Sequence, residues 1–235
     1  MEVRTTQIKS GMPPGENVAF QFSSAVPLRD APFAQADAFP RTGFNKPLPG
    51  IIGIRLVDTA PRYRPESIED LYSISTRMGL NKEIKQQALE LLKTADNIEI
   101  LTESNKPVLH ITYPAYSVPI VLAGEGIRLY VRQSLELAAP AGTVILMEEP
   151  EAHLNIRTIK FSAKALFAAN RRKIQIILTT HSLEFIDELI TAAEPEDLSN
   201  ISLFRLKLKG GKLIHSRFTG EQVATARELL QEDLR

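Results

Sequence analysis

Several features common in other proteins are missing from this chain of 235 residues. It has no cysteine, which excludes disulfides, thiolate zinc sites and a cysteine nucleophile, and which fits a cytoplasmic protein. Its 28 basic and 28 acidic residues balance, so no overall basic field favours nucleic acid. No apolar run approaches the roughly 20 residues that span a bilayer, and no apolar signal-peptide core follows Met1. We expect a cytoplasmic protein without membrane insertion.

The amino-acid composition and the spacing of apolar residues predict that the chain has three parts. Residues 1–63 are rich in proline and glycine, which predicts a loop-rich amino-terminal segment with short strands. Residues 64–115 predict a helical insertion followed by a hairpin. Residues 116–235 alternate strands with helices, which predicts an α/β core with a mostly parallel sheet and flanking helices. The core strands are expected at 143–147, 174–178, 201–207 and 213–218, and the helices at 127–138, 155–169, 183–193 and about 221–234.

The helical insertion has clear start and stop signals. Ser67 and Asp70 form a capping box, and Gly79 ends the first helix. Asn81 is expected to cap a second helix. A hairpin should turn around residues 103–106.

The most informative segment is the apolar run 144–147 followed by Glu148 and Glu149. Such a run predicts a buried parallel strand, and its carboxyl end lies where open α/β sheets bind ligands. The apolar run 174–178 predicts a second buried strand that delivers His181 to the same edge. Two acids and a histidine there indicate metal-assisted chemistry on a phosphate.

Adjacent strand residues point to opposite faces, so Glu148 and Glu149 are expected to have separate roles. One would hold the Mg²⁺ shell while the other faces an attacking water. Neutral His181 could hydrogen-bond a phosphate oxygen and that water. The plainer alternatives are a solvated strand end and a structural histidine, and Ser182 is expected to be a helix N-cap.

These segments resemble those of a known family. Residues 146–155, Leu-Met-Glu-Glu-Pro-Glu-Ala-His-Leu-Asn, are similar to the Walker B and D-loop segment of ABC-type ATPases of the SMC/RecF/OLD group. Residues 179–182, Thr-Thr-His-Ser, resemble their switch histidine, and residues 124–126, Gly-Glu-Gly, lie where that group carries its signature motif. The resemblance covers roughly residues 64–218 and implies a P-loop NTPase-like fold with ATP and Mg²⁺ as cofactors.

The resemblance also implies a role for each matched residue. Glu148 falls at the Mg²⁺-side acid, Glu149 at the general base and His181 at the γ-phosphate sensor. The segment from Glu151 to Asn155 falls at the loop that acts across a head-to-tail dimer. The further cofactor-binding positions are Gly124, Glu125 and Gly126, whose helix N-terminus would meet the nucleotide of the opposite subunit.

The chain departs from the family pattern in one decisive respect, because it has no P-loop. The phosphate cradle requires Gly-x₄-Gly-Lys-Ser/Thr, and the only Gly-Lys pair is Gly211-Lys212, followed by Leu213. The signature serine is also missing near Leu122 and Ala123, and Asn155 replaces a histidine. The sequence therefore resembles the carboxyl-terminal part of an ATPase domain, with the P-loop truncated, supplied by another polypeptide or lost.

Three functions compete. The first is an ATPase of the ABC/OLD group that is competent only with a P-loop from a missing segment or a partner, acting as a dimer. The second is a non-catalytic ABC-like dimerisation or regulatory protein. A Toprim-type nuclease ranks last, because its Asp-x-Asp pair is missing. Nucleic-acid contact would rest on one modest basic cluster, which consists of Lys160, Lys164, Arg171, Arg172 and Lys173.

Overall fold

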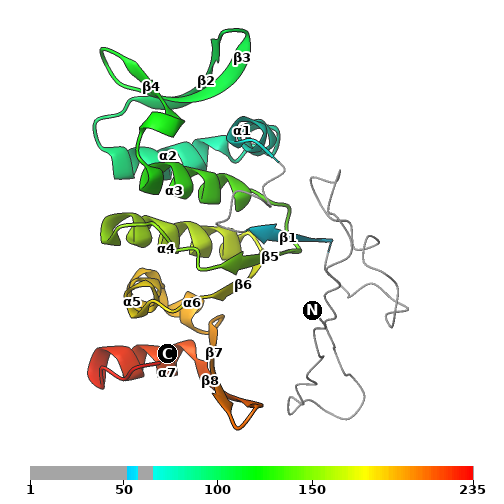
Figure 1. Ribbon diagram of the computed structural model, residues 1–235, viewed down its shortest axis with the longest axis vertical. Coiled ribbons are helices and arrows are strands. Elements are labelled where there is room, and N and C mark those ends of the chain that lie inside the picture. The colour runs from blue at the N-terminus through cyan, green and yellow to red at the C-terminus, as the bar shows by residue number, and fades with distance from the viewer. Residues whose placement is uncertain (1–51, 58–65, 235) are drawn as a thin grey trace. The chain divides into compact units, whose positions relative to one another are not determined.

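A computed structural model describes residues 52–57 and 66–234 (Figure 1). Most of the loop-rich segment expected at 1–63 lies outside the described residues. Within the described ranges, no helix is long and apolar enough to cross a membrane.

A three-stranded parallel sheet forms the centre of the α/β core. Its strands are β1 (Gly53–Val57), β5 (Thr143–Glu148) and β6 (Gln175–Thr179), in the order β1-β5-β6. Both neighbouring pairs are parallel, and the register places Leu56 beside Leu146 and Leu146 beside Ile177. This arrangement confirms the expected fold class, a mixed α/β protein with a parallel sheet.

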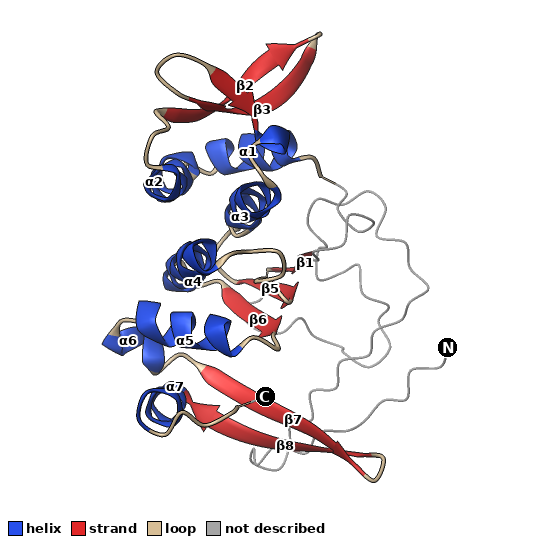
Figure 2. Ribbon diagram, turned by 60° about the vertical axis from the view of Figure 1, so that its left-hand side comes forward, coloured by secondary structure: helices blue, strands red, loops and turns tan. Residues whose placement is uncertain are grey.

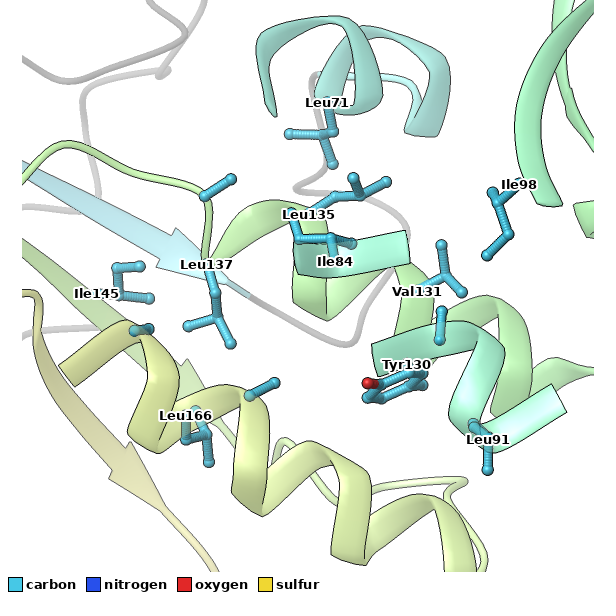
Figure 3. Packing of buried hydrophobic residues seen from close by; sticks show 14 of the residues in the cluster. Leu71, Ile84, Leu91, Ile98, Tyr130, Val131, Leu135, Leu137, Ile145 and Leu166 are labelled. Carbon is cyan, nitrogen blue, oxygen red and sulfur yellow. The ribbon is translucent and has the colours of Figure 1, made fainter. Parts of the chain in front are cut away.

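Three helices cover one face of this sheet: α3 (Glu125–Glu136), α4 (Ile156–Arg171) and α5 (Leu183–Ala192). Figure 2 shows them together on one side of the strands. Ile145 and Met147 of β5 are 0% and 4% exposed on that side, in one cluster with Leu135 of α3 and Leu166 of α4 (Figure 3). Alternation along β5 places these two residues on the helix side and Leu146 on the other.

The prediction that β6 is buried was wrong. Exposure alternates along the strand, and Ile177 remains 48% exposed. The physical reason is position: β6 is one of the two outer strands of this sheet among the described residues, and its Ile176 and Leu178 side chains pack against the core. Ile177 points to the opposite side, where no described helix covers the sheet (Figure 2). An apolar run alone does not distinguish a central strand from an edge strand.

The helical insertion contains α1 (Ile68–Arg77) and α2 (Asn81–Leu92). The Ser67 capping box is confirmed, and Gly79, at φ 74°, follows the last turn of α1 as expected. The predicted Asn81 cap was wrong. Asn81 is the first helical residue, because Leu80 already has helical dihedrals at the N-cap and α2 has no side-chain cap.

An antiparallel sheet follows α2 and consists of β2 (Asn97–Glu103), β3 (Lys106–Thr112) and β4 (Ser117–Pro119). The predicted hairpin is confirmed, with Ser104 and Asn105 both at positive φ in its two-residue turn. Ile98 and Leu109 of this sheet join the same core as Leu71 of α1. The insertion is therefore packed onto the α/β core.

The carboxyl-terminal part contains α6 (Pro195–Leu198), the hairpin of β7 (Ser202–Lys209) and β8 (Lys212–Thr219), and α7 (Gly220–Ala224). The final helix is shorter than predicted. After α7 the chain widens into a π-helical turn at Thr225–Leu229, and the remaining described residues are irregular. Arg227 donates to Asp187 of α5 and to the carbonyl of Glu232, which folds the tail back instead of continuing the helix.

Candidate functional site

Glu148 is the last residue of β5 and is exposed to solvent. It pairs in register with Thr179, the last residue of β6. Both side chains share the sheet face of Leu146 and Ile177, by strand alternation. The structure thus places the predicted metal acid at the carboxyl edge, on the face without a helical layer among the described elements.

Glu149 is not part of the strand, contrary to the expectation that it and Glu148 are adjacent strand residues. Its backbone turns into the left-handed region, at φ 42°. Such a conformation costs a residue with a side chain on the order of 1–3 kcal/mol and is found at sites where geometry matters. A hydrogen bond of 3.0 Å from the Glu149 amide to the Thr179 carbonyl holds it there. The two acids are therefore separated by a backbone turn rather than by strand alternation.

His181 lies beside Glu149. The imidazole Nε2 is 3.8 Å from the Glu149 carboxylate, with the two side chains 87% and 47% exposed. That distance exceeds a direct hydrogen bond, and a pair this exposed adds little stability. Both groups instead face outward at the sheet edge, in reach of a ligand. The structure thus brings together the predicted base and the predicted phosphate sensor, although their roles stay predictions.

The loop after β6 is joined to the turn after β5 through side chains. The Thr180 hydroxyl donates a short hydrogen bond to Oε1 of Glu151. The same hydroxyl accepts the backbone N–H of Ser182 at 3.0 Å. Ser182 in turn accepts the Phe185 N–H at 3.1 Å, which confirms it as the N-cap of α5. Sequence reasoning missed Thr180; the only signal was a hydroxyl directly before the histidine.

Asn155 is the N-cap of α4. Its side-chain oxygen accepts the Thr158 amide at 3.0 Å and the Thr158 hydroxyl at 3.1 Å. The side chain is thus committed to the helix start in this structure. Its predicted contact with a nucleotide stays a prediction.

The segment that resembles the signature motif starts α3. Gly124 is the N-cap at φ 94°, a conformation that favours glycine. A Cβ added to Gly126 would lie 3.4 Å from the His153 carbonyl, so this helix start adjoins the turn after β5. Glu125 pairs with Arg128 on the surface, the Arg128 Nε donating at 3.0 Å. Gly126 therefore lies close to the turn after β5 of its own chain.

Glu148 is the acid predicted to hold Mg²⁺, and by itself it is not a complete metal site. Among the described residues, no group of three His, Asp or Glu side chains could hold a metal ion. Mg²⁺ commonly uses one or two carboxylates, with water and substrate phosphates as its other ligands. The donor set fits a Mg²⁺·nucleotide in which the phosphates supply the remaining ligands.

Two of the five residues of the basic cluster, Arg171 and Arg172, are paired with carboxylates. Arg171 contacts the Asp197 carboxylate at 2.6 Å, and this hydrogen bond raises the pKa of the guanidinium. Arg172 contacts Glu83 at 2.8 Å. These pairs reduce the charge that the two arginines offer to a phosphate, and nucleic-acid contact at the cluster stays a prediction.

Comparisons with known proteins match the same segments. Residues 79–187 match the family described as "AAA domain, putative AbiEii toxin, Type IV TA system". The uncharacterized protein MJECL11 of Methanocaldococcus jannaschii is 30% identical over 113 residues, which are 48% of this chain and 98% of that relative. The matched residues 79–187 include Gly124, the turn after β5 and His181.

Solved structures with a similar fold include SMC proteins. One, from work on ATP-driven dimerization and DNA-stimulated activation of SMC ATPases, has a TM-score of 0.47 and 13% identity, over 71% of this chain and 99% of that one. The SMC head domain from Thermotoga maritima has a TM-score of 0.41 and 16% identity, over 69% and 53% of the two chains.

Proposed function

This chain belongs to the AAA-domain ATPase family that it matches over residues 79–187, and from that premise we propose that it is the acidic half of an ATP-hydrolysing site. The other half is a P-loop, which a missing segment or a partner provides. The chain hydrolyses ATP only in the completed assembly. The observation that carries this proposal is the approach of His181 to Glu149, at 3.8 Å, beside the strand-end Glu148.

Each of the three residues has a task suited to its position. Glu148, exposed at the end of β5, would hold Mg²⁺, which neutralises phosphate charge when bound. Glu149 accepts the proton of the attacking water, because its backbone turn aims it out of the strand. His181 hydrogen-bonds the terminal phosphate and keeps that water in line.

The exposed apolar residues on the sheet face opposite the helices favour a second layer, formed by the missing segment or the partner that carries the P-loop. We call this sheet face the open face; its apolar row is Leu56, Leu146 and Ile177, aligned across three strands. Leu56 is 53% exposed and Ile177 is 48% exposed. Parallel sheets normally have both faces covered. Because Glu148 lies on this face, a P-loop-bearing strand–helix segment packed on the open face would lie next to the Glu148 carboxylate.

A head-to-tail dimer would place Gly124 and Gly126 against the nucleotide of the other subunit. Gly124 is the N-cap of α3, and the N-terminus of a helix directs backbone N–H groups toward such an anionic ligand. Val121 and Leu122 precede it at 62% and 72% exposure, as expected of an interface that is covered in a dimer. Glu151 and Asn155 belong to the turn that would meet the same interface.

The second candidate is a non-catalytic protein that dimerises or regulates without turnover. The missing P-loop favours it, because the chain lacks the main clamp for the β- and γ-phosphates. ATP turnover in the presence of a P-loop polypeptide separates the two. A catalytic half-site gains binding and turnover when a P-loop polypeptide joins it, whereas a non-catalytic scaffold gains no turnover.

The test measures ATP binding and hydrolysis with Mg²⁺, for the purified chain and for its complex with a P-loop-bearing polypeptide from its own genome. The chain alone should show no turnover. In the complex, Glu149→Gln should lower kcat about 10²- to 10⁴-fold while ATP binding persists, and His181→Ala should slow turnover strongly.

Glu228→Gln, an exposed acid in the carboxyl-terminal turn, serves as the matched control and should leave the rate unchanged. Turnover in the complex that Glu149→Gln leaves intact would overturn the assignment of the base. Turnover by the chain alone, abolished by Glu149→Gln, would overturn the need for a P-loop partner.

A further inference from the structure

We propose that Thr180 and Glu151 form a clamp that positions His181 toward Glu149, an inference that rests on the proposed function. The His181 side chain is 87% exposed, and its nearest ionic neighbour among the described residues is Glu149 at 3.8 Å, so its own contacts do not fix the imidazole. The backbone conformation around His181 must therefore set the position of the imidazole. That backbone is held at the residue before His181 and at the residue after it.

A single hydroxyl group makes both hydrogen bonds of the clamp. Thr180 Oγ1 donates to the Glu151 carboxylate and accepts the amide N–H of Ser182, 3.0 Å away. A hydroxyl can do both at once, because it has one proton and two lone pairs. The peptide after His181 is thereby tied to the turn after β5, which also carries Glu149.

A second connection joins the same two segments. The Glu149 amide donates to the carbonyl of Thr179 at 3.0 Å, which holds Glu149 at its positive φ. The turn after β5 and the end of β6 are thus joined by one backbone hydrogen bond and by the Thr180–Glu151 hydrogen bond. Neither bond uses the side chain of Glu149 or His181, so both side chains stay free for a ligand while their spacing is set.

The Glu151 carboxylate is turned inward rather than toward solvent. Its second oxygen, Oε2, is buried and has no hydrogen-bond partner among the described residues. Burying an acceptor without a partner costs free energy, and such a group in a native fold calls for an explanation. A hydrogen bond to a carboxylate is stronger than one to a neutral acceptor, which gives the clamp its stiffness. Glu151 is therefore a positioning residue acting through Thr180.

The test uses NMR on the purified full chain, whose four histidines give a small set of imidazole signals. Thr180→Val keeps the shape and removes both bonds. It should raise hydrogen exchange of the Ser182 amide at least tenfold and shift the His181 imidazole signals. Thr180→Ser keeps the hydroxyl and should restore both. Thr191→Val, at an exposed position of α5, is the control and should change neither.

In the complex with a P-loop polypeptide, Thr180→Val should lower kcat about tenfold with ATP binding unchanged, and Thr180→Ser should recover it. Unchanged Ser182 exchange and His181 signals in Thr180→Val would overturn the clamp, whatever the rates. Thr180→Val could alter these signals while the turnover of the complex is insensitive to Glu149→Gln and His181→Ala. That result would overturn the proposed function but not the clamp. The two proposals therefore fail in different measurements.

Discussion

The two faces of the β1-β5-β6 sheet contrast sharply. On one face, Ile145 and Met147 are 0% and 4% exposed beneath α3 and α4. On the open face, Leu56 and Ile177 keep about half of their surface exposed, at 53% and 48%. The strand-end acid Glu148 lies on the open face. The covered face holds the fold together, whereas the open face carries the incomplete part of the proposed site.

The largest expected effect comes from the covered face. Ile145→Ala should lower the free energy of unfolding by about 2–5 kcal/mol, because it removes buried methyl groups and leaves a cavity between β5 and the helices. Ile177→Ala, on the open face, should change it by about 0.5 kcal/mol or less. Urea denaturation followed by circular dichroism measures both. Equal losses would mean that the open face is as well packed as the covered one.

A charge on the open face tests its role as a docking surface. Ile177→Asp should weaken binding to the P-loop-bearing polypeptide more than tenfold, since a carboxylate would be desolvated in the contact. The melting temperature of the chain alone should stay nearly constant, because the position is half-exposed. Binding is measured by isothermal titration calorimetry, with Gln175→Asp, exposed on the same strand and face, as the control for added charge. Equal affinities for wild type and Ile177→Asp would place the docking surface elsewhere.

The smallest effect concerns the start of α4, a helix of the covered face. Asn155→Ala should cost about 1 kcal/mol, because the Thr158 amide loses its cap. Asn81→Ala is the matched control: Asn81 does not cap α2, so the change should be near zero or slightly stabilising. Thermal unfolding of both variants measures the difference. A cost at Asn81 equal to that at Asn155 would contradict the cap assignment.

Much of this molecule could be predicted from local pattern. The Ser67 capping box, the turn at Ser104-Asn105 and the Ser182 cap depend on residues a few positions apart, so short-range chemistry determines them. The cap wrongly expected at Asn81 shows the limit, because the preceding Leu80 had already entered the helix. The position of the candidate site residues at one sheet edge could likewise be predicted from the strand ends, whereas their roles stay predictions.

Local pattern was enough to predict the succession of strands and helices and the arrival of Glu148, Glu149 and His181 at one sheet edge, since the carboxyl ends of parallel strands lie at the same side. The tertiary structure was needed to show that β6 is an outer strand of the described sheet with Ile177 exposed, because strand order depends on which segments pair across the chain. It also decided that Glu149 leaves the strand at positive φ and that Thr180 joins Glu151. Those contacts link residues about thirty positions apart, which no local pattern of side chains encodes.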